Sequence, residues 1–365
     1  MEPGGSLSIE SGGMMNLDDV SRFEELDPGG MLAEIDGLPD QLESAWKLGW
    51  KQPLGEISGV RKVLIAGMGG SAIAADLLAA YVAPMATVPI IVWRDYDLPG
   101  FSADHETLVI ACSHSGNTEE TLSAFTAAVE SETQLLAITT GGELTKQANS
   151  NDVPLWHFDH VGQPRAAVGH SFGLLLALMT RLGLIPDPEE ELFTAVKEMR
   201  SQQGDLCAQS PVVENPAKRM AGQLIGRCPT IIGAEILAPV ARRWRTQIGE
   251  LAKAVAGFEA LPEADHNMVA GVLHPESLLS NTMVVFLKGS QVHERNILRS
   301  QVTREILMVE GFGTDVIEAR GDTRLAQQWT ALHFGDYTSY YLAMAYGVDP
   351  TPVDAIEDLK RRLRT

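Results

Sequence analysis

The chain of 365 residues is 45% hydrophobic and 21% charged, a composition typical of a soluble globular protein with room for two domains. Its formal charge of -20 at pH 7 repels nucleic acid and anionic membranes, and no apolar run is long enough to cross a bilayer. The 3 cysteines are too few and too scattered for a disulfide framework or a zinc knuckle. These features predict a cytoplasmic protein that binds neither nucleic acid nor membrane.

The chain opens with a Gly/Ser-rich segment, and residues 1–16 are predicted to be disordered or derived from an expression vector. Between residues 17 and 50, apolar side chains such as Leu38, Leu42 and Trp46 follow a helical pattern. Short β-rich runs then alternate with segments of helical length. Strands are predicted at 63–66, 90–93, 108–111 and 135–138, and helices at 72–81 and about 172–182.

Residues 185–188, IPDP, predict a linker, after which the same rhythm repeats. The strands predicted in the second half are 230–233, 283–287 and 316–318. Alternating strands and helices favour parallel sheets that are covered on both faces. We therefore expect an α/β fold with two similar αβα sandwich domains, each with a mostly parallel sheet flanked by helices. The first is residues 17–190 with an N-terminal helical segment, and the second is residues 191–365 with a C-terminal helix.

The most informative segment lies where the strand at 108–111 ends and a polar helix begins at Glu119. Its sequence, SHSGNT at 113–118, places three hydroxyl side chains, an asparagine and a glycine in six positions. Free backbone N–H groups at a helix start attract anions, and hydroxyl groups add neutral donors. A phosphate cradle is therefore predicted here. The alternative is that these residues only cap the helix, although one cap needs one such residue.

A second loop, GMGGS at 67–71, follows the first predicted strand. Glycine lets the backbone approach a ligand closely, and Ser71 adds a donor at the start of the next helix. The loop loosely imitates a dinucleotide-binding motif, but no acidic residue lies cleanly at the end of the second strand, so nucleotide binding is disfavoured. Cys112, beside the cradle, is predicted to be a buried structural thiol rather than a nucleophile.

Together, GMGGSAIAADLL and SHSGNTEETL resemble the sugar isomerase (SIS) domain. Four further segments are similar to the bifunctional phosphoglucose/phosphomannose isomerase family: PRAAVGHSFG, RRWRTQIGELAK, LPEADHNMVAG and GDYTSYYLAMAYGVDPTPVDAIEDLKRRL. The resemblance runs from about residue 38 to the C-terminus in a consistent order. It implies two SIS domains, a homodimer with shared active sites, and activity that needs no metal or other cofactor.

The resemblance also implies a role for each site residue. The residues implied to hold the substrate phosphate are Gly69, Gly70, Ser71, Ser113, Ser115 and Thr118. Those implied to carry the chemistry are Glu250 as the base, Arg165 over the reacting carbons, Lys360 near the sugar ring oxygen, and His266 of the neighbouring subunit as the ring-opening group.

These residue types suit aldose–ketose interconversion. One carboxylate can carry a proton between C1 and C2, a cation can stabilise the enediolate oxygen, and His or Lys can protonate the ring oxygen. Taken singly, each has a plainer interpretation: an exposed helix charge for Glu250, a surface ion pair for Arg165, part of a turn and helix cap for His266, and a solvated charged tail for Lys360. Their joint occurrence in family order favours the catalytic interpretation.

The chain departs from the family pattern at two positions, which leaves substrate preference open: Leu251 replaces an asparagine, and His114 replaces an aromatic residue. We expect a metal-independent isomerase that interconverts glucose 6-phosphate, mannose 6-phosphate or both with fructose 6-phosphate through a cis-enediol. The alternative is a weak or inactive SIS-domain protein that binds sugar phosphates and regulates a partner. A zinc-dependent mannose phosphate isomerase would need a His/Glu cluster that this sequence lacks.

Overall fold

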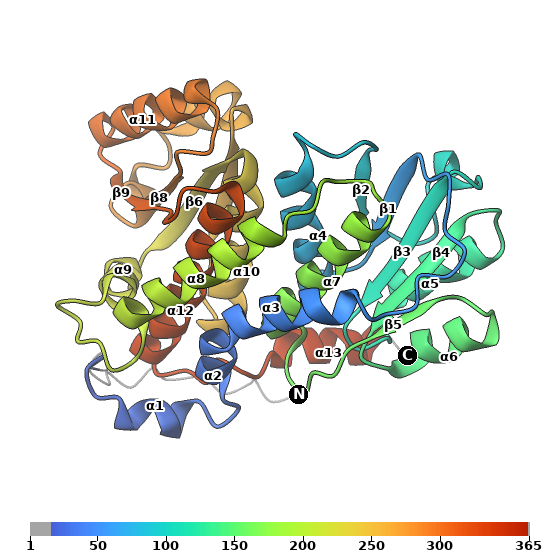
Figure 1. Cartoon of the computed structure of the whole chain (residues 1–365). Helices are drawn as coiled ribbons and strands as arrows, with labels where there is room; N and C mark the ends of the chain where they lie inside the picture. Colours follow the sequence, from blue (N-terminus) through green and yellow to red (C-terminus); the bar gives the residue numbers. More distant parts are fainter. Residues whose placement is uncertain (1–15, 364–365) are drawn as a thin grey trace, which may run out of the picture.

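The computed structural model describes residues 16–363 and contains two parallel sheets with helices around them (Figure 1). The predicted disordered segment, residue 16 apart, lies outside the described residues. The helical pattern of residues 17–50 forms three helices instead of one: α1 (Ser21–Leu26), α2 (Met31–Asp36) and α3 (Leu38–Gly49). Asp27 separates the first two, because its carboxylate accepts hydrogen bonds from the backbone N–H groups of Met31 and Leu32 at 2.8 and 2.9 Å.

The first sheet has the strand order β2-β1-β3-β4-β5, with every pair parallel. Its strands are β1 (Lys62–Ala66), β2 (Ile90–Trp93), β3 (Thr107–Ser113), β4 (Gln134–Thr139) and β5 (Leu155–His157). The connecting helices are α4 (Gly69–Val82), α5 (Glu119–Val129), α6 (Gly142–Ser150) and α7 (Val168–Arg181). The sheet is covered on both faces, because alternate residues of β3 pack into different cores: Leu108 and Ile110 with α4 and α7, and Val109 with α5.

The second sheet has the order β7-β6-β8-β9 and is also parallel throughout. Its strands are β6 (Cys228–Ala234), β7 (Gly257–Leu261), β8 (Thr282–Lys288) and β9 (Gly313–Glu318). The helices of this half are α8 (Glu189–Leu206), α9 (Pro216–Leu224), α10 (Ala238–Leu251), α11 (Glu294–Val309), α12 (Arg324–Tyr346) and α13 (Asp354–Leu363). The α/β prediction with two sheet-bearing halves is therefore confirmed.

Two of the strands, β5 and β7, were not predicted from the sequence. β5 has only three residues, and β7 is an edge strand of mixed polarity in which only Leu261 is buried. A short strand or a half-exposed one leaves little apolar pattern in the sequence. Two helices also begin earlier than predicted: α4 at Gly69 and α7 at Val168.

Helix α12 joins the two halves. Every residue from 325 to 345 is buried, and the helix packs against α8, α9 and α10 as well as α2 and α4. One hydrophobic core therefore extends through both halves. The predicted domain boundary after residue 190 falls in the first turn of α8 and stays a prediction.

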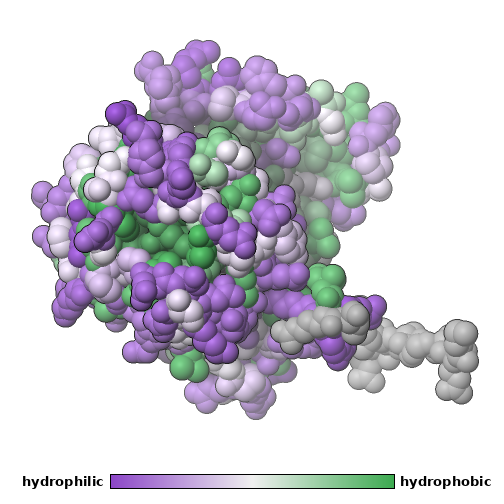
Figure 2. Space-filling model, turned by 90° about the vertical axis from the view of Figure 1, so that its right-hand side faces the viewer, coloured by the Kyte–Doolittle hydropathy of each residue, from purple (hydrophilic) through white to green (hydrophobic). Residues whose placement is uncertain are grey.

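The surface is mostly polar. On the side that carries the first sheet, hydrophilic residues surround a hollow in which apolar residues gather (Figure 2). None of the helices within residues 16–363 is long and apolar enough to span a membrane.

Candidate active site

One part of the candidate site lies at the point where the strand order of the first sheet reverses. The chain leaves β1 toward β2 on one side, and β3 lies on the other side, so the connections after β1 and β3 diverge there. Ligands of open parallel sheets bind at such points, beyond the carboxyl ends of the strands. Both sequence-predicted phosphate segments, 67–71 and 113–118, follow these two strands directly.

Two helix N-termini, those of α4 and α5, begin at this edge without a side-chain cap. The N-cap residues Met68 and Thr118 make no side-chain cap hydrogen bond. The Thr118 hydroxyl instead lies 2.8 Å from the hydroxyl of Ser113. Thr118 therefore does not cap α5 with its side chain, whereas Asn117 Oδ1 accepts from the Glu143 N–H in the first turn of α6 at 3.0 Å. The uncapped starts of α4 and α5 leave backbone N–H groups for an anion.

The helix start at Gly69 changes the place of three predicted site residues. Gly69, Gly70 and Ser71 lie in the first turn of α4 rather than in a loop before it. Gly69 has φ of 51°, a left-handed conformation that favours glycine. Ser71 and Ser113 are buried at this edge, whereas Ser115 is exposed.

The loop at 113–118 is held by its neighbour at the start of α6. Backbone N–H groups of Thr140 and Leu144 donate to the carbonyls of His114 and Gly116 at 3.1 and 2.9 Å. At Gly116, where φ is 64°, an added Cβ would lie 1.8 Å from a backbone oxygen, so only glycine fits. These contacts fix the conformation of the loop.

Arg165 connects this edge to the second half of the chain. It lies in a short 3-10 helix, η2 (Pro164–Ala167), that packs so closely on α4 that a Cβ at Gly70 would lie 2.4 Å from the Pro164 carbonyl oxygen. The guanidinium is 4% exposed, and its Nη2 donates to the carbonyls of Pro350 and Thr351 at 2.9 and 2.6 Å. Burial lowers the pKa of Arg165, and the Glu250 carboxylate opposes that shift.

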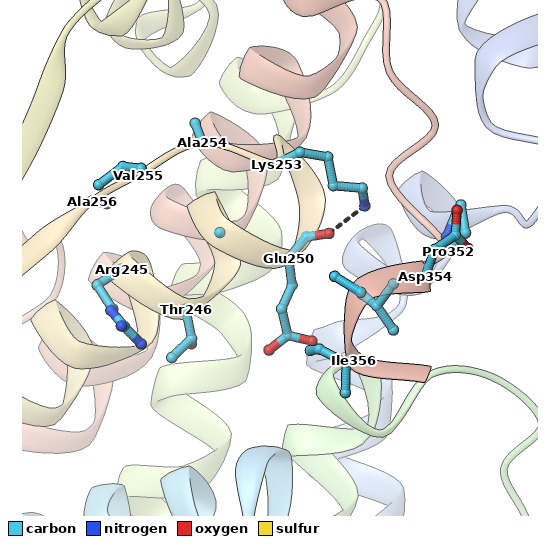
Figure 3. Close-up of a pocket in the computed structure, with 13 residues that line it drawn as sticks. Arg245, Thr246, Glu250, Lys253, Ala254, Val255, Ala256, Pro352, Asp354 and Ile356 are labelled. Atoms are coloured by element: carbon cyan, nitrogen blue, oxygen red, sulfur yellow. Dashed lines mark hydrogen bonds between the residues drawn. The ribbon is translucent and has the colours of Figure 1, made fainter. Parts of the chain in front are cut away.

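Glu250 faces Arg165 from the last turn of α10, with Glu250 Oε2 3.4 Å from Arg165 Nη1. It lines a pocket of about 700 Å³ between the end of α10, the segment 253–256 and the start of α13 (Figure 3). Because α10 follows β6 and returns to β7, its end lies at the amino edge of the second sheet. The pocket therefore lies at the amino edge of the second sheet, and every residue that lines it belongs to the second half of the chain. Glu250 is not a freely solvated helix charge.

The structure does not bring all four predicted catalytic residues together. His266 is exposed in a second 3-10 helix, η4 (Glu263–His266), which Asp265 ties to α11 through a 2.8 Å ion pair with Arg299. Lys360 is exposed on α13, four residues after the pocket-lining Ile356. Neither residue is among those that line the pocket. Their roles stay predictions.

Lys253 is a pocket residue that the sequence analysis missed. Its ammonium lies 2.5 Å from the backbone oxygen of Glu250 (Figure 3). It also lies 3.4 Å from the backbone oxygen of Pro350, to which Arg165 donates as well. Its φ of 55° is unusual for a side chain other than glycine. Burial and the Arg165 charge lower the pKa of Lys253, while Asp349 and Glu250 oppose the shift. The contact with Glu250 spans three positions, but the contact with Pro350 spans 97, so no local sequence pattern marks the second one.

A buried ion pair between α10 and α12 contacts the backbone of Arg165. Arg243 of α10 donates to Asp336 of α12 at 3.1 and 2.7 Å, and its Nη2 also donates to the carbonyl of Arg165 at 3.1 Å. Both ion-pair side chains are 2% exposed. The second half of the chain thus helps to hold Arg165 in place.

The corresponding point of the second sheet, between β6 and β8, is occupied by a carboxylate. Glu235, with φ of 49°, accepts hydrogen bonds from the backbone N–H of His293 and from Asn296 at 2.8 and 2.9 Å, at the start of α11. This carboxylate takes the donors that an anion would use. The two halves therefore differ at this point: α11 is capped by His293, whose ring nitrogen accepts from the Arg295 N–H, although α10 also begins without a side-chain cap.

Cys112 is buried, as predicted, and burial raises the pKa of its thiol to about 11, so it is not a thiolate nucleophile at neutral pH. Within residues 16–363, no group of three or more His, Cys, Asp or Glu side chains is placed to hold a metal ion.

Comparison with known proteins adds the family context. Residues 56–152 match the family model of the SIS domain, and residues 213–363 match that of the bacterial phospho-glucose isomerase C-terminal SIS domain. A bifunctional phosphoglucose/phosphomannose isomerase of Caldicellulosiruptor bescii is 37% identical over 335 residues, which is 91% of this chain and 98% of that relative. The enzyme of the same name from Aquifex aeolicus is 31% identical over 332 residues, with coverage of 90% and 97%.

Among solved structures, a hypothetical protein from Thermus thermophilus matches with a TM-score of 0.74. It is 17% identical, and the match covers 95% of this chain and 93% of that one. This likeness concerns the fold alone.

Proposed function

Because the chain belongs to the bifunctional phosphoglucose/phosphomannose isomerase family, we propose that it interconverts glucose 6-phosphate, mannose 6-phosphate or both with fructose 6-phosphate. Relatives that carry the family name share about a third of their residues with it over nine-tenths of the chain. It is accordingly a sugar-phosphate isomerase, and the proposal concerns its substrates, its site residues and its chemical route.

The observation that carries the proposal is the approach of Glu250 Oε2 to Arg165 Nη1 at 3.4 Å. Glu250 lines an open pocket, and the η2 helix that carries Arg165 packs against Gly70 in the first turn of α4. In the proposed pose, the phosphate binds at the α4 and α5 N-termini through Ser71, Ser113, Ser115 and Thr118 with the Gly69–Gly70 backbone. The sugar then extends past Arg165 toward Glu250. Neutral donors suit this anchor, since they need no buried counter-charge.

In this scheme Glu250 removes the proton from C2 of the opened aldose and returns it to C1 of the ketose. The Arg165 guanidinium stabilises the enediolate oxygen that carries negative charge between these steps. Both C2 epimers give the same cis-enediol, so use of both aldoses requires rotation about the C2–C3 bond. His266 of a second subunit and Lys360 are the groups proposed to act at the ring oxygen.

A coupled assay for fructose 6-phosphate with either aldose phosphate tests the proposal. Glu250→Gln is expected to lower kcat by roughly 10³-fold, within the range measured for lost general bases, with a smaller change in KM. Glu305→Gln, an exposed carboxylate on α11, is the matched control and should retain wild-type rates. Activity is expected to survive prolonged treatment with a chelator.

Failure of the wild-type protein to form fructose 6-phosphate from either aldose would refute the proposal. Retention of activity in Glu250→Gln would refute the assigned base. Binding of hexose 6-phosphates without turnover would favour the alternative of a regulatory sugar-phosphate-binding protein.

A further inference from the structure

A hydrogen-bonded row of side chains outside the pocket joins three separate parts of the first half. His114 Nε2 lies 2.8 Å from His160 Nδ1, and His160 Nε2 lies 3.2 Å from Glu34 Oε2. Glu34 belongs to α2, His160 to the segment between β5 and η2, and His114 to the loop at 113–118. The row therefore ties the candidate phosphate loop to the segment that carries Arg165.

The negative charge of the Glu34 carboxylate determines which atom donates and which accepts in each hydrogen bond of this row. An ionised carboxylate can only accept, so His160 donates to Glu34 through its Nε2–H. The other nitrogen of a neutral His160, Nδ1, then carries a lone pair and accepts from the Nε2–H of His114. Gln41 of α3 also donates to Glu34 Oε2 at 3.2 Å and holds that carboxylate in place. Glu34 thus selects one tautomer for both rings.

Packing leaves these rings little room to move. The His160 side chain is 6% exposed, and a Cβ at Gly162 would lie 2.9 Å from Glu34 Oε1 and 3.0 Å from His160 Cε1. His170 of α7 closes the other side, with its ring 5.6 Å from that of His160 and stacked on Phe158. Burial lowers the pKa of His114 to about 4, so this ring is neutral at pH 7 and takes part as a directed hydrogen-bond donor.

We propose that Glu34 and His160 are positioning residues that hold the phosphate loop in register with Arg165. His160 precedes Arg165 by five residues, and His114 lies between Ser113 and Ser115, so one ring pair links the two substrate-contacting segments. A hexose 6-phosphate carries its phosphate and its reacting carbons at opposite ends. The fit of the reacting end therefore depends on the distance between these segments. This inference rests on the proposed function for the identity of the two segments.

The loop itself is secured on its other side by the bonds from Thr140 and Leu144. Loss of the row should therefore leave the phosphate anchor formed but free the Arg165 segment. This gives an expectation that a merely structural role would not produce: kcat falls, while anion affinity is retained.

His160→Phe tests the proposal, because it keeps an aromatic ring and removes both hydrogen bonds. His170→Phe is the matched control, since it makes the same substitution in the same cluster but outside the row. We expect His160→Phe to lower kcat at least tenfold while the dissociation constant for sulfate changes less than threefold. Hydrogen exchange in segment 159–166 should be at least tenfold faster than in wild type. His170→Phe should stay within twofold in all three measurements.

Glu34→Gln is the second variant, in case His160→Phe does not fold. An amide of the same size can donate as well as accept, so it no longer selects the His160 tautomer. A smaller loss of kcat in the same direction is expected.

Equal kcat values for His160→Phe and His170→Phe would overturn the proposal, as would a loss confined to KM. If the wild-type protein is inactive on hexose phosphates, the proposed function fails. The exchange comparison still decides this inference, because unchanged exchange in segment 159–166 contradicts it without any assay of activity.

Discussion

The protonation of single residues in this protein depends on their burial as well as on their type. His114, His170 and His333 have pKa values lowered from 6.5 to about 4, and in each the leading cause is burial, which disfavours the charged form. His333 of α12 is 0% exposed and lies 2.9 Å from the carbonyl oxygen of Ile35. These three histidines are neutral in the folded protein at pH 7.

The fold should therefore become less stable as the pH decreases. As the pH drops below 6.5, the unfolded chain binds protons at these positions while the folded chain does not until near pH 4, so acid favours unfolding. His333 alone should lower the free energy of unfolding by about 1.5 kcal/mol between pH 6.5 and 5, as the slope rises from half of its limit toward about 1.4 kcal/mol per pH unit. Urea unfolding at several pH values measures this slope.

His333→Gln is the control for that measurement. Its amide can still donate to the Ile35 carbonyl but does not titrate, so the stability of the variant should depend less on pH. Equal slopes for wild type and His333→Gln would contradict the prediction.

At the scale of elements, the contact between α4 and η2 determines where Arg165 lies. The strand-then-helix pattern placed the start of α4 at Ala72, but the helix begins three residues earlier, and the Ser71 and Ala72 N–H groups donate to the Met68 carbonyl in its first turn. Gly70 then lies against the Pro164 backbone. A glycine at this point permits an approach of two backbones that no other residue allows.

Gly70→Ala should consequently displace η2. A Cβ would lie 2.4 Å from the Pro164 carbonyl oxygen and 3.3 Å from the Arg165 Cα, so the short helix must move away. We expect kcat/KM to fall at least tenfold, which corresponds to about 1.4 kcal/mol or more of transition-state stabilisation. Steady-state kinetics on both aldose phosphates provides the measurement.

The matched control is Gly204→Ala in the exposed part of α8, where a Cβ meets nothing within 4 Å. This change should leave kinetics unaltered and stabilise the helix by about 0.5–1 kcal/mol. Wild-type kinetics in Gly70→Ala would show that η2 can move without consequence.

At the scale of the whole molecule, the candidate site depends on how the two halves meet. Helix α12 carries a continuous core between them, and Arg165 and Glu250 approach each other across that junction. His266 and Lys360 remain exposed and outside the pocket in a single chain. In an active site shared between two copies of the chain, these two residues would lie near the bound sugar.

Subunit exchange tests that arrangement. Inactive Glu250→Gln and His266→Ala proteins are mixed under conditions that exchange subunits. In a mixed dimer one site regains both wild-type groups, so random pairing should restore about a quarter of wild-type activity.

A mixture of Glu250→Gln with Arg165→Ala is the control. Both residues act from the same chain in our scheme, so no mixed site regains both groups and activity should stay absent. No recovery in the first mixture, with exchange confirmed by mass spectrometry, would contradict a shared site.

Local patterns in the sequence were sufficient for the α/β class, for seven of the nine strands within residues 16–363 and for the two segments at the carboxyl edge of the first sheet. Each of these follows from neighbouring residues, because strands, helix starts and strand ends leave apolar, glycine and hydroxyl patterns within a few positions. The family resemblance added Glu250 and Arg165 as separate residues. β5 and β7 were missed because a three-residue strand and a half-exposed edge strand leave too little pattern.

Tertiary structure alone decided which of these residues meet. Glu250 and Arg165 are 85 positions apart, and Glu34 and His160 are 126 positions apart, so no local pattern records either contact. The contacts of Lys253 with Pro350 and of Arg243 with Asp336 and the Arg165 carbonyl likewise join residues that are far apart in the sequence. The physical reason is that hydrogen bonds and ion pairs act over a few ångströms in space. The sequence encodes those distances only through the packing of the whole core.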